Sequence, residues 1–215
     1  MRCKYCHNPD TWAKTEGEMK SAEEILQQAL RYKRYWGKKG GITVSGGEAL
    51  LQIDFVTELF TLAKEKGVNT CLDTSGNPFT REEPFYSKFE KLMEVTDLFM
   101  LDIKEMDEDE HKKLTGQTNK NILDMATCLS DHGKAMWIRH VLVPGITDDD
   151  GQLHRLRAFI DTLKTVERVE ILPYHTLGVF KWKELGIPYA LEDVEPPTKE
   201  QVEHAREIII PDYKS

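Results

Sequence analysis

The stretch ITVSGGEALLQIDFVTELFTLAKEKGVNTCLDTSG, residues 42–76, predicts the class of fold. Its first three residues form a short β-branched run, and apolar residues at helical spacing then follow as far as Gly67. Residues 70–72 form a second apolar run that is short enough for a strand. A strand, an amphipathic helix and another strand in this order are typical of a parallel β-α-β unit.

The same alternation continues through the chain. Further strands are predicted at 98–101, 135–138 and 169–172, and helices near 21–30, 85–93, 121–132, 147–163 and 198–209. Five strands separated by helices predict an α/β protein with a parallel sheet, which right-handed crossovers would curl into a full or partial barrel. We expect one domain, 1–215. Residues 177–197 show little periodicity and are expected to form a long, functional loop.

The composition excludes several classes of protein. The 215 residues carry 29 basic and 37 acidic side chains, so the net charge of −8 argues against a nucleic-acid partner. No apolar run approaches the ~18 residues of a membrane span, and no signal segment precedes the first cysteine. We therefore expect a cytoplasmic protein without a membrane partner. In that compartment the four cysteines are not expected to form disulfides.

Two of these cysteines belong to a C-x-x-C-H stretch at residues 3–7. Such spacing serves c-type haem attachment, zinc binding, thiol–disulfide chemistry or part of an iron–sulfur site. Haem attachment normally follows export, and zinc would need a fourth ligand. The stretch alone leaves these four alternatives open.

Polar residues gather where the predicted strands end. They are residues 45–48, residues 73–76, residues 102–104, Arg139 and His175. The ends of parallel barrel strands share one mouth, where active sites form. The glycine pair Gly46-Gly47 would let a ligand approach the backbone, while carboxylates beside lysine and arginine suit a ligand with both charges. An amino-acid-bearing nucleoside fits this description.

Six motifs in this order carry a resemblance: C-x-x-C-H-N, S-G-G-E, T-C-L-D-T-x-G, M-L-D-I-K, W-I-R and L-P-Y-H. They resemble the radical S-adenosylmethionine family, and most of all its pyruvate formate-lyase-activating members, from Arg2 to about Lys199. The resemblance implies a partial TIM-like (β/α)6 barrel, a 4Fe–4S cluster and S-adenosylmethionine. It implies an oxidoreductase of anaerobic metabolism. Reductive cleavage of that ligand would yield a radical that takes hydrogen from a glycine of a partner enzyme.

The resemblance also implies partners. They are the glycyl-radical loop of pyruvate formate-lyase and a flavodoxin- or ferredoxin-type electron donor, with the activating enzyme itself a monomer. An activator of another glycyl-radical enzyme is the alternative within this class. Larger activators of this class usually carry further cysteine clusters after the first motif, and the absence of any cysteine between Cys6 and Cys71 favours the pyruvate formate-lyase type.

The resemblance assigns roles to residues of this chain. Cys3 and Cys6 would bind the cluster, and Arg139 would lie near the sulfonium or the partner's glycine loop as a catalytic residue. A monovalent cation, Na+ or K+, would be held by Asp73, Thr74, Met100 and Asp102. The residues implied to bind the cofactor are Tyr5, Cys6, His7, Asn8, Gly46, Gly47, Glu48, Asp102, Ile103, Lys104 and His175.

One departure from the family pattern concerns the first cluster cysteine. It is implied four residues before Cys3, upstream of Met1. We expect a chain that lacks this cysteine and the family's first strand, and that is destabilised and inactive as it stands. Neither Cys71 nor Cys128 is expected to substitute. A C-x-x-C-H metal or haem module, or a fragment that only binds its partner, remains an alternative.

Overall fold

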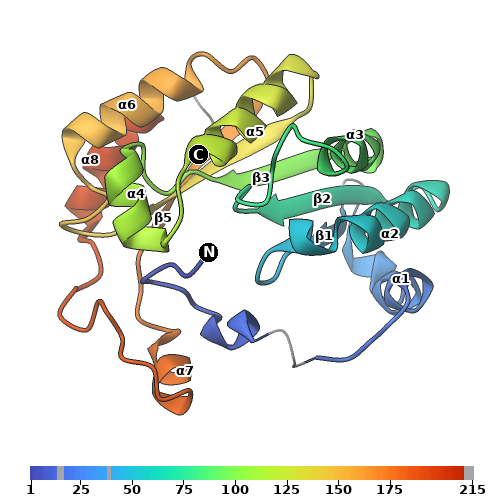
Figure 1. Cartoon of the computed structure of the whole chain (residues 1–215), viewed down its shortest axis with the longest axis horizontal. Helices are drawn as coiled ribbons and strands as arrows, with labels where there is room; N and C mark the ends of the chain where they lie inside the picture. The colour runs from blue at the N-terminus through green and yellow to red at the C-terminus, as the bar shows by residue number, and fades with distance from the viewer. Residues whose placement is uncertain (14–16, 38–39, 211–215) are drawn as a thin grey trace.

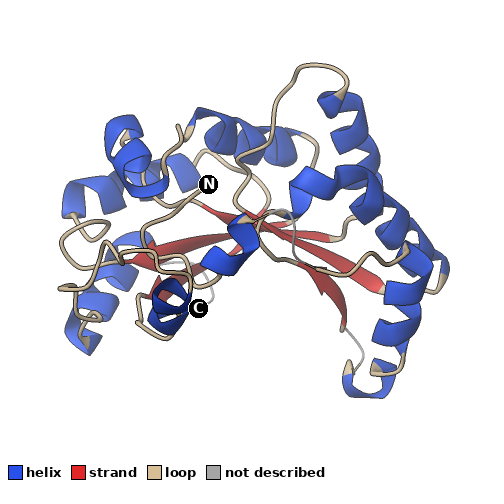
Figure 2. Ribbon diagram, turned by 60° about the horizontal axis from the view of Figure 1, so that its bottom comes forward, coloured by secondary structure: helices blue, strands red, loops and turns tan. Residues whose placement is uncertain are grey.

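The computed structural model describes residues 1–13, 17–37 and 40–210, so the end of the predicted domain, 211–215, lies outside the described residues. Its sheet has five strands in the order of the chain, and every neighbouring pair is parallel. The strands are β1 (Gly41–Val44), β2 (Asn69–Thr74), β3 (Leu98–Asp102), β4 (Met136–Leu142) and β5 (Val166–Pro173). The parallel α/β prediction is confirmed, and the strand order is that of a barrel segment (Figures 1 and 2).

Helices follow the strands as right-handed crossovers require. They are α1 (Ala22–Leu30), α2 (Ile53–Glu65), α3 (Phe85–Val95), α4 (Glu108–Thr115), α5 (Lys120–Asp131), α6 (Asp150–Ile160), α7 (Val179–Glu184) and α8 (Lys199–Ile209). The described residues also form the short 3-10 helices η1 (Pro9–Trp12), η2 (Lys33–Tyr35) and η3 (Ala49–Gln52). The sequence prediction missed α4, which is rich in charged residues and has little apolar periodicity. None of the helices in the described part is long and apolar enough to cross a membrane.

The strands alternate between a buried and a half-exposed face. Phe99, Leu101 and Ile138 are fully buried and belong to one core with residues of the helices. Met100 and Arg139 alternate with them and are half-exposed. The helices therefore cover one face of the sheet, and the other face is open and carries polar side chains.

Capping residues begin several helices. Ser21 and Glu24 form the predicted capping box of α1. The predicted cap of α6 at residue 147 or 148 is wrong, because Asp149 caps this helix. Thr147 is fully buried, and its hydroxyl instead accepts from Val143 N at 2.8 Å, which closes the turn after β4.

The prediction of one long loop at 177–197 is wrong for part of the segment. Residues 179–184 form α7, which lies beside the N-terminal segment, apart from the helices that cover the sheet (Figure 1). A six-residue helix is too short to be stable alone, so contacts with other parts of the chain must hold it. Trp182 of α7 is only 4 % exposed, which identifies one such contact.

Candidate functional site

A cavity of about 890 Å³ opens at the carboxyl ends of the strands, on the open face of the sheet. Sites for small ligands usually have volumes of ~300–1,000 Å³. Most of the predicted site residues line it: Cys3, Tyr5, Cys6, His7, Asn8, Gly46, Gly47, Glu48, Asp73, Thr74, Asp102, Lys104, Arg139 and His175. The structure thus brings together residues that are up to 172 positions apart (175 − 3).

Two predicted site residues do not line the cavity. Ile103 is 1 % exposed, and its side chain belongs to the hydrophobic core. Its backbone carbonyl accepts from His140, so this residue supports the loop after β3 from behind. Met100 is half-exposed. It lies two residues before Asp102 on β3, on the same face of the sheet but farther from the carboxyl end of the strand.

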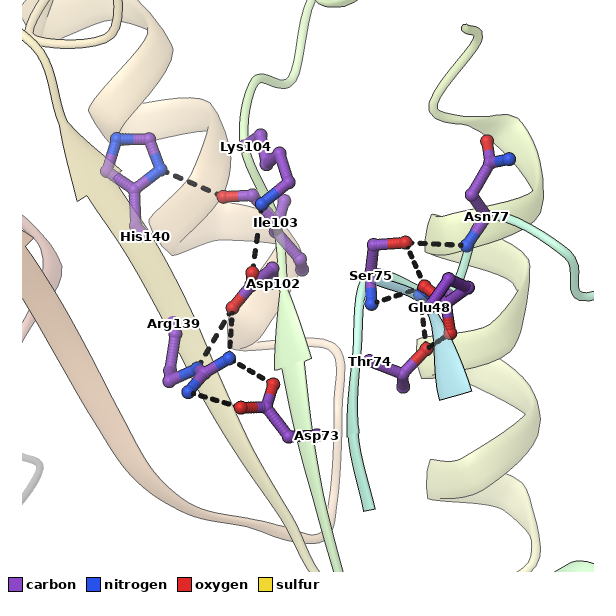
Figure 3. A network of polar contacts seen from close by, with 11 residues as sticks. Glu48, Asp73, Thr74, Ser75, Asn77, Asp102, Ile103, Lys104, Arg139 and His140 are labelled. Atoms are coloured by element: carbon purple, nitrogen blue, oxygen red, sulfur yellow. Dashed lines mark hydrogen bonds and ion pairs between the residues drawn. The ribbon is translucent and has the colours of Figure 1, made fainter. Parts of the chain in front are cut away.

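Arg139 lies between two carboxylates (Figure 3). Its Nε donates to Asp102 Oδ1 at 2.9 Å, and its Nη1 donates to Asp73 Oδ2 at 3.1 Å. The Nζ of Lys104 is 2.9 Å from Asp102 Oδ2. Two carboxylates and two cations therefore form a charge-balanced network on the cavity wall.

The two carboxyl groups of this network titrate differently. Burial raises the pKa of Asp73, and the nearby charge of Asp102 adds to that effect, while Arg139 opposes it. Burial alone would also raise the pKa of Asp102, but Lys104 and Arg139 hold it below its ordinary value. Asp73 is therefore the carboxyl of the pair that takes up a proton more readily.

Three of the side chains that were predicted to bind the monovalent cation, those of Asp73, Thr74 and Asp102, already bond to other groups of the protein. The guanidinium of Arg139 lies where an ion bridging Asp73 and Asp102 would lie. The hydroxyl of Thr74 donates to Glu48 Oε1 at 2.5 Å. An ion at this position would have to compete with Arg139 for both carboxylates.

Glu48 joins the loop after β1 to the loop after β2. Its carboxylate accepts from Ser75 N at 3.0 Å and from the hydroxyls of Thr74 and Ser75 (Figure 3). It also accepts from Leu50 N at 3.1 Å. Glu48 was predicted to bind cofactor. The structure places it at the cavity with both carboxylate oxygens engaged by these protein donors.

The loop 3–12, which we call the cysteine loop, forms another wall of the cavity. Cys6 N donates to Cys3 O at 3.0 Å, which closes a turn around the two thiols. Burial raises the pKa of the Cys3 thiol, and the charge of Lys104 opposes this effect. The rings of His7 and His175 stack with their centroids 4.1 Å apart.

The described residues fit the implied cofactors to different extents. The cavity offers the volume and mixed charges that S-adenosylmethionine requires. Iron–sulfur clusters are held by cysteine thiolates, and Cys3 and Cys6 place two thiols at the cavity. Cys71 lies in β2 and Cys128 in α5, and neither lines the cavity. Across residues 1–13, 17–37 and 40–210, no group of three or more His, Cys, Asp or Glu side chains could hold a metal ion.

Sequence reasoning missed the residues that support the cysteine loop from outside. Lys181 and Trp182 of α7 both bond to this loop. The available signal was the aromatic and basic cluster in the motif FKWKE, residues 180–184, inside an otherwise aperiodic segment. Periodicity does not detect such a segment because it contacts a distant part of the chain rather than a core.

Comparisons with known proteins agree with this geometry. Residues 1–156 match the family model described as the Radical SAM superfamily. The chain is 56 % identical over 211 residues to the pyruvate formate-lyase-activating enzyme of Streptococcus mutans, covering 97 % of this chain and 80 % of that protein. It is 50 % identical over 210 residues to the enzyme of the same name from Listeria monocytogenes, covering 97 % and 85 %.

Solved structures with a similar fold include a domain of pyruvate-formate lyase-activating enzyme from Bacteroides vulgatus. Its TM-score is 0.65 at 21 % identity, over 80 % of this chain and 94 % of that one. A radical SAM methyltransferase from Sphaerobacter thermophilus has a TM-score of 0.69 at 16 % identity, over 96 % and 59 %. At these identities the likeness is evidence for the fold alone.

Proposed function

Because the chain belongs to the radical S-adenosylmethionine superfamily and, within it, to the family of pyruvate formate-lyase-activating enzymes, we propose that it activates pyruvate formate-lyase under anaerobic conditions. The family implies a 4Fe–4S cluster and S-adenosylmethionine. When bound, the cluster supplies the electron for reductive cleavage of S-adenosylmethionine, and the resulting radical takes a hydrogen atom from a glycine of the partner. The identity of 50–56 % over 97 % of the chain carries this proposal.

The residues of the cavity have complementary roles in this proposal. Cys3 and Cys6 hold the cluster through their thiolates. Gly46 and Gly47 let the amino group of the ligand approach the backbone, and Gly46 has a φ of 136°, which favours glycine. Lys104 and Asp102 offer one charge of each sign to the zwitterionic end of the ligand.

The other proposed binding residues complete the cavity. Tyr5, His7 and Asn8 of the cysteine loop line it, together with His175. Their rings and polar groups would surround the ligand and exclude water from it.

Arg139 is proposed as the catalytic residue. Its side chain is on the cavity wall and carries the charge nearest to both Asp73 and Asp102. A bound Na+ or K+ between these carboxylates, with Thr74 and Met100 as further ligands, would release the guanidinium toward the ligand or the partner's glycine. The convergence of two carboxylates on one position supports this ion site.

Further proposals concern the surroundings of the reaction. We place the protein in the cytoplasm as a monomer, with a flavodoxin- or ferredoxin-type protein as electron donor. The reduced thiols that the cluster needs are stable in a reducing compartment. The second candidate function is activation of a different glycyl-radical enzyme through the same chemistry.

The deciding experiment uses the full-length protein, with any residues upstream of Met1. It is reconstituted anaerobically with iron and sulfide, reduced, and studied by electron paramagnetic resonance with and without S-adenosylmethionine. We expect a 4Fe–4S signal that changes when the ligand is added, and a glycyl radical on purified pyruvate formate-lyase. A radical that forms only on another glycyl-radical enzyme would favour the second candidate, and no ligand-dependent signal would overturn both.

A further inference from the structure

The segment 174–189, from the end of β5 through α7, lies directly against the cysteine loop. The indole Nε1 of Trp182 donates to the carbonyl oxygen of Cys6 at 2.8 Å. Its ring packs edge-on against Trp12 of the cysteine loop and against Tyr189, each with centroids 5.1 Å apart. Trp182 is thus enclosed on both sides and directed at a single backbone atom.

Other residues of the segment also contact the cysteine loop. Lys181 Nζ donates to Asn8 Oδ1 at 2.7 Å and lies 3.1 Å from Asp10 Oδ1. Gly178 approaches His7 so closely that a Cβ on Gly178 would lie 2.7 Å from His7 Cα. Hydrogen bonds, an ion pair and close backbone packing each require a particular geometry. Together they therefore fix how the segment 174–189 lies against the cysteine loop.

The first cysteine of the loop has a different support. Arg2 N donates to Thr115 O at 2.9 Å, and Lys4 N donates to Leu114 O at 3.0 Å, which fixes the backbone on both sides of Cys3 to the end of α4. At Cys6 itself, the hydrogen bond from Trp182 has the corresponding role. With it, both backbone polar groups of Cys6 are engaged, N with Cys3 and O with Trp182.

From this arrangement we propose that the segment 174–189 is a clamp on the cysteine loop and that Trp182 is the positioning residue for Cys6. The proposal rests on the proposed function in so far as Cys3 and Cys6 hold a cluster. Metal ligands need to be held within ~0.5 Å by groups that are themselves fixed by packing. The clamp lies beyond residues 1–156, the part that matches the superfamily model, so it adds a support from outside that part.

The test compares Trp182→Phe with the wild-type protein. Phenylalanine keeps a ring between Trp12 and Tyr189 but removes the N–H that holds Cys6 O. In the cluster-free protein, the rate at which iodoacetamide alkylates Cys6, followed by peptide mass spectrometry, should rise about five-fold, as expected for the loss of one hydrogen bond. Trp36→Phe, in the segment between α1 and β1, is the matched control and should leave the rate unchanged.

The second readout uses the reconstituted protein. Iron release to a chelator should also become about five-fold faster in Trp182→Phe, and the midpoint potential of the cluster should shift, whereas Trp36→Phe should match the wild type. A purely structural role of Trp182 in the fold would lower the unfolding midpoint without changing the relative rate at Cys6 in the folded protein.

A second variant decides the matter if Trp182→Phe does not fold. Lys181→Met removes the bonds to Asn8 and Asp10, and Lys183→Met on the exposed side of α7 is its control. Faster alkylation of Cys6 in Lys181→Met alone supports the clamp. If Cys6 is alkylated at the wild-type rate in both Trp182→Phe and Lys181→Met, whichever of them fold, the proposed clamp is wrong. If the wild type forms no cluster, the proposed function fails, while the alkylation rates still test the clamp.

Discussion

Arg139 and Asp102 are register partners on the adjacent strands β4 and β3, and Arg139 Nε lies 2.9 Å from Asp102 Oδ1. The pairing of β3 with β4 therefore places these two side chains next to each other. Asp102 has a second cation in Lys104, whereas Asp73, within the described part of the chain, forms an ion pair with Arg139 alone. The network is thus asymmetric, and loss of Arg139 should affect the two carboxylates differently.

We expect Arg139→Met to lower the free energy of unfolding by about 3 kcal/mol, because it leaves Asp73 partly buried without its cation. Urea denaturation followed by circular dichroism measures this change. In the double variant Asp73→Asn with Arg139→Met, part of the loss should be recovered because the uncompensated charge is gone. Equal stability of the single and double variants would contradict this account of the network.

A bound monovalent cation should compete with Arg139 for Asp73 and Asp102. We therefore expect the affinity of the reconstituted protein for S-adenosylmethionine to rise when choline chloride is replaced by potassium chloride at constant ionic strength. Asp73→Asn should abolish this difference, because it removes one of the two bridging carboxylates. Equilibrium dialysis of both proteins measures it, and an ion effect of the same size in Asp73→Asn would remove the proposed site.

Glu48 should be needed mainly to hold two loops together. Glu48→Gln replaces one accepting oxygen by an NH2 group that faces the donors of Leu50, Thr74 and Ser75, so the free energy of unfolding should fall by about 2 kcal/mol. Glu58→Gln, on the exposed side of α2, should change it by less than ~0.5 kcal/mol. Urea unfolding of both variants tests this, and equal midpoints would show that these bonds contribute little.

The architecture and the location of the cavity were predictable, because both depend on local patterns. Alternating runs such as 42–44 and 70–72 define parallel strands, and parallel strands end at the same edge. Lys104 and His175 could be placed at this edge without knowing their partners.

The interactions between these residues could not be predicted from the sequence. The choice of Arg139 as the partner of Asp73 depends on the register and curvature of three strands, which no local pattern records. Ile103 was expected at the ligand, but the turn after β3 directs it into the core. The role of Trp182 depends on a contact 176 residues away. Such contacts follow from the complete fold.

Stability should fall as the pH decreases below about 6.5, with His111 contributing. Burial and the charge of Lys104 lower the pKa of His111, although a bond to Gln117 O opposes this. Below pH 6.5 the unfolded chain therefore binds a proton that the folded one does not, and up to about 1.4 kcal/mol per pH unit is lost until the lower folded pKa is reached. His111→Asn should reduce the dependence of the unfolding free energy, measured with urea, on pH between 7 and 5. The control is His154→Asn, at an exposed position of α6, which should leave that dependence unchanged.

Gly178 should tolerate no side chain, because a Cβ would lie 2.7 Å from the Cα of His7. Its φ of −88° suits any residue, so the cost of Gly178→Ala is steric and not conformational. We expect the free energy of unfolding to fall by about 1–3 kcal/mol, as overpacking does, and amide hydrogen exchange to accelerate in the cysteine loop. Gly151→Ala in α6 is the control: a Cβ there would meet only the side-chain oxygen Asp149 Oδ1, at 3.1 Å, rather than backbone, so the cost should be clearly smaller and exchange in the cysteine loop should not change. Unchanged exchange in residues 3–12 of Gly178→Ala would show that the two segments are not rigidly joined.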